Sequence, residues 1–212
     1  EFSPEGGLYI IERRGRIRYL DPLTREVSAA GELEVYSEAE NGLMGITFAP
    51  DFRETAHGYL YYATDEGGRH RYRLSRFEFR DGKLLPETEK VMMEVGIDPG
   101  ETGHEGGDLQ FDVEGNLWIS PGDDSYPHAI DGYAPMNESL PTQNALGTSA
   151  NSQDLRGKIL RIRPQPDGSY TIPNGNLFAD PEQGRPEIYV MGLRNPFRFH
   201  FDDRTQTLYW GE

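Results

Sequence analysis

The chain has 212 residues, a net charge of −15 at pH 7, no cysteine, and 25 glycines and 15 prolines. This length suits one domain or part of a larger one, and the many turn-forming residues argue against long helices. The lack of cysteine excludes disulfides, thiolate catalysis and Cys-ligated metals. The acidity disfavours binding to nucleic acid. No stretch reaches the ~18 apolar residues of a membrane helix, so we expect no membrane insertion.

The basic residues are strongly biased towards arginine. Of 21 lysines and arginines, only Lys83, Lys90 and Lys158 are lysines. An acidic surface with few lysines suits a high-salt environment, in which repulsion between like charges is screened. A GC-rich genome that encodes an ordinary acidic protein explains the same bias, so halophily is one of two open interpretations.

Strand-like alternation of apolar and polar residues dominates the chain, and no long segment has a helical period. Turn signals divide the strands: Gly15 in the first pair, Asp81-Gly82 in a hairpin, and the Glu114-Gly115-Asn116 turn further on. The expected strand-rich segments are 7–22, 42–52, 58–68, 71–95, 107–123, 157–170 and 187–212.

A loose repeat of an apolar strand, an acidic turn and an aromatic strand occurs three times, beginning at Phe48, Phe111 and Phe201. Repeated antiparallel units of this size favour the blades of a β-propeller over a plain β-sandwich. We expect one domain, 1–212, with a long loop insertion at about 124–156. At four strands a blade the chain holds about three to four blades, so we expect further blades or another chain to close the ring.

His104 lies in the glycine-rich stretch "ETGHEGGDLQF" and is the strongest candidate for a general base. Its unshifted pKa is near neutrality, so it can accept a proton at working pH. Asp123 follows the strand that pairs with the one after His104, and so could orient the imidazole. The alternative is a structural turn that carries a solvated histidine.

Two further polar groups are candidates for ligand contacts. Arg194 and Asn195, in "GLRNPF", offer a planar set of donors and an amide for carboxylates or quinone oxygens. Glu40 and Asn41 precede a strand at Gly42. Each group could equally be an ordinary ion pair or turn. The five histidines lack zinc-ligand spacing, and the acidic clusters fit no EF-hand, so no metal ligands are assigned.

Taken in order, five motifs resemble the glucose/sorbosone dehydrogenase family, which includes soluble quinoprotein glucose dehydrogenase and aldose sugar dehydrogenases that use pyrroloquinoline quinone (PQQ). The resemblance runs collinearly over nearly the whole chain. Its motifs are "ENGLMGITFAPDF", "GHEGGDLQFDVEGNLWISPGDD", "SQDLRGKILRI", "DGSYTIPNGNLF" and "EIYVMGLRNPFRFHFD".

The resemblance implies an all-β, six-bladed propeller of which this chain contains about half to two-thirds. It implies PQQ-dependent oxidation of an aldose at its anomeric carbon to the lactone, with transfer of electrons to an acceptor that the sequence does not identify. His104 falls on the catalytic base and Asp123 on the acid that orients it. Arg194, Asn195, Glu40 and Asn41 fall at the PQQ and sugar pocket.

Calcium, which polarises PQQ in this family, is expected to use ligands beyond residue 212, so we expect the 212-residue chain alone to be inactive. The family also implies an extracytoplasmic location, although no signal peptide is visible. Two alternatives remain: a non-enzymatic propeller that binds a partner, and a calcium-dependent sugar lactonase. The lactonase would need a carboxylate-rich metal site that the sequence does not reveal.

Overall fold

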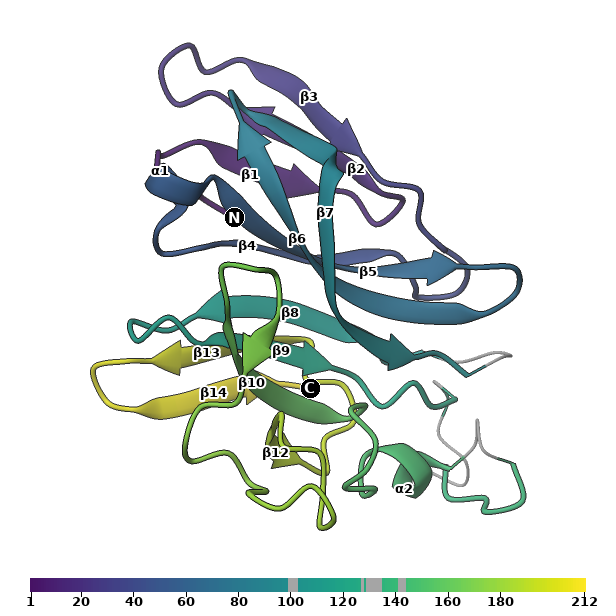
Figure 1. Cartoon of the computed structure of the whole chain (residues 1–212). Helices are drawn as coiled ribbons and strands as arrows, with labels where there is room; N and C mark the ends of the chain where they lie inside the picture. Colours follow the sequence, from purple (N-terminus) through teal and green to yellow (C-terminus); the bar gives the residue numbers. More distant parts are fainter. Residues whose placement is uncertain (99–102, 127, 129–134, 141–143) are drawn as a thin grey trace.

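The computed structural model describes residues 1–98, 103–126, 128, 135–140 and 144–212. In this part of the chain, antiparallel sheets follow one another in sequence order and lie face to face (Figure 1). The first sheet has the order β1-β2-β3. Its strands are β1 (Leu8–Ile11), β2 (Arg16–Leu20) and β3 (Val27–Glu32). The expected pair in 7–22 is confirmed, whereas β3 was not predicted because its mostly exposed residues show no apolar alternation.

The second sheet is a four-stranded meander in the order β4-β5-β6-β7. Asp81 and Gly82 both have positive φ, 52° and 72°, between β6 and β7. This confirms the expected turn, because a two-residue hairpin loop of type I′ needs left-handed backbone at both central positions. The elements of this sheet and its connection are β4 (Leu43–Phe48), α1 (Phe52–Thr55), β5 (His57–Asp65), β6 (His70–Arg80) and β7 (Lys83–Gly96).

The third sheet has the order β8-β9-β10, and both β11 and β12 pair with β10. β12 joins this sheet only after an excursion of the chain, and β11 covers only the far end of β10. The strands are β8 (Gly106–Phe111), β9 (Leu117–Pro121), β10 (Lys158–Pro164), β11 (Tyr170–Thr171) and β12 (Ile188–Met191).

A final hairpin pairs β13 (Arg198–Asp202) with β14 (Thr207–Gly211). The three repeats found in the sequence correspond to β4-β5, β8-β9 and β13-β14, which are the first hairpins of three successive sheets. The first strands of neighbouring sheets also lie against each other: β1 contacts β4, β4 contacts β8, and β8 contacts β13. This radial arrangement is that of propeller blades.

Part of the expected loop insertion at 124–156 lies outside the described residues. Its described residues contain the short helix α2 (Ala145–Thr148) and an isolated bridge between Met136 and Asn144. The one-domain organisation of 1–212 remains a prediction.

Three apolar clusters fill the spaces between consecutive sheets. The sequence of β5, "HGYLYYATD", is almost continuously apolar because both faces of the strand are covered. Leu60 faces the first sheet and Tyr61 the third, and both are fully buried. A strand that is covered on both faces cannot show simple alternation. The stacking of the sheets determines which strand ends lie next to each other at each edge of the sheets, and one of these edges carries the candidate site.

Candidate functional site

The predicted site residues come together at one edge of the second and third sheets. His104 directly precedes β8, Asp123 follows β9, Arg194 and Asn195 follow β12, and Glu40 precedes β4. β8 and β9 are antiparallel, with Gly106 opposite Pro121. The start of β8 and the end of β9 therefore share an edge, which is the hairpin geometry expected from the sequence.

His104 and Asp123 face each other. The His104 Nδ1 lies 3.6 Å from the Asp123 Oδ1, with 15% of the histidine side chain exposed and the aspartate fully buried. That separation exceeds an ordinary hydrogen bond, and catalytic contacts are often long in unliganded sites. Nδ1 is turned inward towards the carboxylate, which leaves Nε2 as the nitrogen that can accept a proton from a ligand.

The protonation of this pair is set by burial. Burial lowers the pKa of His104 below its usual value, and the charge of Arg194 lowers it further, while Asp123 acts in the opposite direction. Burial raises the pKa of Asp123. The imidazole is thus neutral at neutral pH, which is the form a general base needs.

The backbone around His104 is held in an uncommon conformation. His104 has φ = 65°, a left-handed value that costs about 1–3 kcal/mol for a residue other than glycine. A Cβ at Gly122 would lie 1.6 Å from the His104 carbonyl oxygen, so the chain can pass here only as glycine. The Gly122 N–H donates to the Glu105 carbonyl at 3.0 Å. These contacts explain the glycine-rich composition and fix the position of the imidazole.

Arg194 and Asn195 are held by hydrogen bonds at the same edge, next to the end of β9 and the start of β8. The Asp123 N–H donates to the Arg194 carbonyl at 2.8 Å, and the Gly106 N–H donates to the Asn195 Oδ1 at 3.1 Å. The Arg194 guanidinium lies 3.9 Å from the Asp123 Oδ2 and donates to the Tyr126 carbonyl at 3.2 Å. With 26% of its side chain exposed, Arg194 can still reach a ligand.

Glu40 and Asn41, which precede β4 of the second sheet, add a contact from that sheet to the site. The His104 N–H donates to the Glu40 Oε2 at 2.8 Å, a contact between residues 64 positions apart. Asn41 is 2% exposed, and its buried Oδ1 makes no hydrogen bond to any residue that the structure describes, while Arg13 donates to its carbonyl at 2.7 Å. An unsatisfied buried amide oxygen is costly, so Asn41 has spare capacity for a ligand donor.

A second layer of charged residues beneath His104 was not predicted. Glu105 is 4% exposed, and burial followed by repulsion from Asp124 raises its pKa well above the usual range. Arg156 pairs with Asp98 at 2.8 Å, with Asp124 at 3.1 Å and with Asp154 at 2.7 Å. These residues come from four segments, so only the folded structure shows that they are neighbours.

Lys158, at the start of β10, is fully buried beside this layer. Its ammonium donates to the carbonyls of Thr148, Ser149 and Arg156 at 2.8, 3.0 and 2.7 Å. Burial lowers its pKa to about 8. The three carbonyls satisfy all three donors of the ammonium, so Lys158 supports the loop rather than serving as a free base.

The described residues contain no cluster of three histidine, aspartate or glutamate side chains placed to hold a metal ion. Nor does any helix among them have the length and apolar character needed to span a membrane.

The fold and the site together define an arc of a β-propeller with a polar centre at one edge of its blades. The family model for glucose/sorbosone dehydrogenases matches residues 1–212, and the chain belongs to that family. This confirms the resemblance inferred from the five motifs and the all-β propeller fold.

Individual relatives agree with this assignment. Aldose sugar dehydrogenase YliI of Escherichia coli is 28% identical over 92% of this chain and 47% of its own length. The human Hedgehog-interacting protein is 24% identical over 92% of this chain and 28% of its own.

Among solved structures, a glucose dehydrogenase-type oxidoreductase from Thermus thermophilus matches with a TM-score of 0.77 and 28% identity, over 99% of this chain and 55% of its own. The PQQ-bound aldose sugar dehydrogenase of Streptomyces coelicolor matches with a TM-score of 0.70 and 25% identity, over 98% and 53%. The chain thus spans about half the length of these dehydrogenases.

Proposed function

We propose that this chain supplies the base-bearing part of a PQQ-dependent aldose dehydrogenase. The observation that carries the proposal is the pair of half-buried His104 and fully buried Asp123, held 3.6 Å apart beside the Arg194 guanidinium. Family membership and the similarity to a PQQ-bound aldose sugar dehydrogenase support the cofactor. An extracytoplasmic location, as the family implies, is part of the same proposal.

The residues at this edge fit an anionic quinone. Arg194 offers a partly exposed guanidinium, a good donor to carboxylate or quinone oxygens. Asn195 adds an amide group directly after it in the chain, and Asn41 adds another beside Glu40, with an Oδ1 that has no hydrogen-bond partner among the described residues. PQQ, when bound, supplies the hydride acceptor. The described residues offer no cluster for calcium, so no step is assigned to that ion.

The role of the protein is then to move one proton and to hold the sugar. His104 accepts the proton of the anomeric hydroxyl at Nε2 as the anomeric C–H leaves as hydride, which gives the lactone. Asp123 holds the ring through Nδ1 and stabilises the imidazolium that forms. Arg194 would hold a quinone oxygen of PQQ, when it is bound, and would favour negative charge there.

We expect His104→Ala to lower kcat about 10²–10⁴-fold, the usual contribution of a general base. The assay is steady-state sugar oxidation by the full-length protein with PQQ and calcium supplied. Arg80→Gln, an exposed residue on β6 that pairs with Glu78, is the control and should keep the wild-type rate. A His104→Ala variant that retains wild-type turnover would exclude His104 as the base.

A second candidate is a non-enzymatic propeller that binds a partner. The observation in its favour is the similarity to Hedgehog-interacting protein over 92% of this chain. A folded full-length protein that neither binds PQQ nor oxidises any aldose would favour this candidate.

A further inference from the structure

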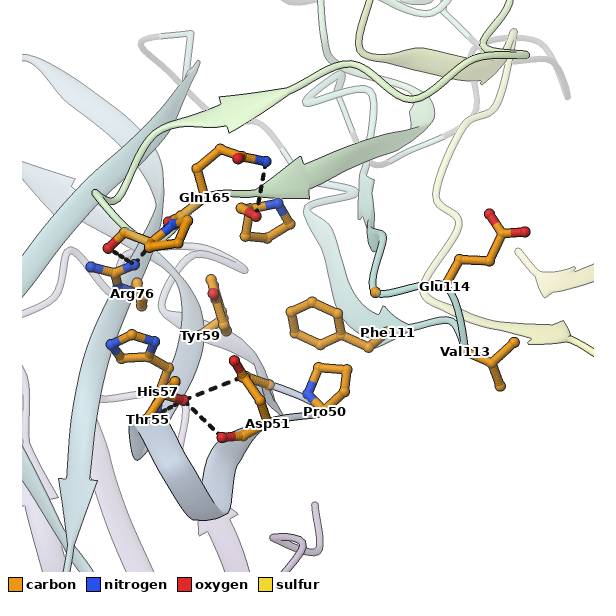
Figure 2. A pocket seen from close by; sticks show the side chains of 14 residues that line it. Pro50, Asp51, Thr55, His57, Tyr59, Arg76, Phe111, Val113, Glu114 and Gln165 are labelled. Carbon is orange, nitrogen blue, oxygen red and sulfur yellow. Dashed lines mark hydrogen bonds between the residues drawn. The ribbon is translucent and has the colours of Figure 1, made fainter.

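A separate cavity of about 380 Å³ lies at the opposite edge of the second and third sheets. Its walls are the turn after β4, side chains from β5 and β6, the β8-β9 turn and the end of β10 (Figure 2). β4 and β8 start at the His104 edge and end at the cavity. The volume is within the range of small-molecule sites, about 300–1,000 Å³.

Arg76 is the charged group of this cavity. It is 7% exposed, and its Nη1 donates to the carbonyls of Gln165 and Pro166 at 3.0 and 3.1 Å (Figure 2). Among the described residues Arg76 makes no ion pair, whereas Arg73 and Arg156 each have carboxylate partners. The exposed Asp167 carboxylate, whose pKa is lowered by hydrogen bonds from Ser169 and also by the charge of Arg76, forms no ion pair with it. A buried guanidinium without a direct counter-charge is costly, and a ligand carboxylate would supply that charge.

Aromatic side chains form the wall next to Arg76. Tyr59 is 3% exposed, and its ring lies 5.2 Å from that of Phe111 in an edge-to-face arrangement. Figure 2 shows His57 on the same side as Arg76 and Tyr59 between them and Phe111. Burial raises the pKa of Tyr59 to about 12, so its hydroxyl remains a donor. The wall therefore suits a flat apolar group attached to an acceptor.

The rim has the opposite charge. Asp51 and Glu114 line it together with Val113, whose side chain is 79% exposed. The Asp51 Oδ1 accepts a hydrogen bond from the Thr55 hydroxyl at 3.3 Å. Two carboxylates at the entrance repel polyanions such as nucleotides, while one deep arginine can neutralise a single carboxylate.

We propose that this cavity binds a small aromatic monocarboxylate, with the carboxylate on Arg76 and the ring against the wall that Tyr59 and Phe111 form together. The site shares no residue with the His104 centre, so this proposal does not depend on the proposed dehydrogenase function.

The test uses phenylacetate as the probe and its neutral amide, 2-phenylacetamide, as the matched ligand, with calorimetric titration of the full-length protein. For about ten ligand atoms we expect a dissociation constant of about 1 mM or below for phenylacetate. The amide should bind at least about tenfold more weakly, because it cannot pair with the guanidinium. Equal binding of acid and amide would overturn the proposal.

Variants assign the binding to the cavity. Arg76→Gln should abolish the preference for the acid, whereas Arg80→Gln, an exposed residue on the same strand that pairs with Glu78, should leave it intact. Arg76→Gln also disturbs the contacts to Gln165 and Pro166, so Val113→Glu provides a second test at the exposed rim. It should weaken phenylacetate binding severalfold and leave the amide unchanged. Absence of phenylacetate binding at 10 mM, roughly ten times the expected constant, or equal affinity of wild type and Val113→Glu, would contradict the proposal.

Discussion

At the start of β8 the charged side chains face one another, whereas at its end Arg76 makes no ion pair among the described residues. The first edge combines a left-handed His104, a fully buried Asp123 and a partly exposed Arg194. The second combines a deep arginine with aromatic rings. The same sheets thus present a centre with an internal acid–base pair at one edge and a simple charged cavity at the other. At the first edge a neutral base lies beside the acid that orients it.

Among substitutions that would remove the acid–base pair of the first edge, Asp123→Asn should have the largest effect on activity. The amide keeps the Oδ1 that accepts the Ser125 N–H at 3.1 Å but loses the charge that stabilises the imidazolium. We expect sugar oxidation to fall about 10²–10⁴-fold. Because Asp123 raises the pKa of His104, the acid limb of kcat/KM should also move to lower pH. A purely structural role would leave that limb in place, and phenylacetate binding at the other edge should not change.

Arg194→Gln should have a smaller effect, on the cofactor rather than on the base. Loss of hydrogen bonds from a charged donor, about 1.5–3 kcal/mol, should raise the PQQ dissociation constant about 10- to 100-fold. Arg194 lowers the pKa of His104, so in this variant the acid limb should move to higher pH, opposite to Asp123→Asn. Fluorescence titration and a pH–rate profile provide the two readouts. Shifts in the same direction for both variants would refute the electrostatic account.

The smallest effect is expected for Glu105→Gln, which alters the charged layer beneath His104. The raised pKa of Glu105 means that the folded protein binds this proton more tightly than the unfolded chain. Wild-type stability is therefore lost as pH rises from about 4.5 through the folded-state pKa. The variant should melt about 2–4 °C higher than wild type near pH 8, a shift of order 1 kcal/mol, with the gain shrinking towards pH 4.5. Glu87→Gln, an exposed residue, is the control; a gain that does not depend on pH would count against this explanation.

Much of the fold was predictable because local signals agreed with it. The turn at Asp81-Gly82 and the three aromatic repeats mark hairpins that the structure contains. The strand β3 escaped prediction because only Ala30 within it is buried, and the pairing of β12 with β10 could not be read locally because about two dozen residues separate them.

Some parts of the candidate site could also be predicted from the sequence, and others could not. The approach of His104 to Asp123 follows from hairpin geometry, so sequence reasoning could reach it. Arg194 and Glu40 could be proposed as ligand contacts from their side-chain chemistry and the family resemblance, but their places beside His104 and Asp123 could not be predicted, because contacts across 64 or more residues leave no local pattern. The layer of Glu105, Asp124 and Arg156 left no signal, since acidic residues are common in this chain and only burial distinguishes these.

The most direct test of the central claim is an absorbance titration of the full-length protein with PQQ, in calcium-containing buffer and before any sugar is added. We predict saturable binding at micromolar PQQ with one cofactor per chain, weakened in Arg194→Gln and unchanged in Arg76→Gln. A folded protein that shows no PQQ binding at these concentrations, or binding that depends on Arg76 and not on Arg194, would contradict the proposed site.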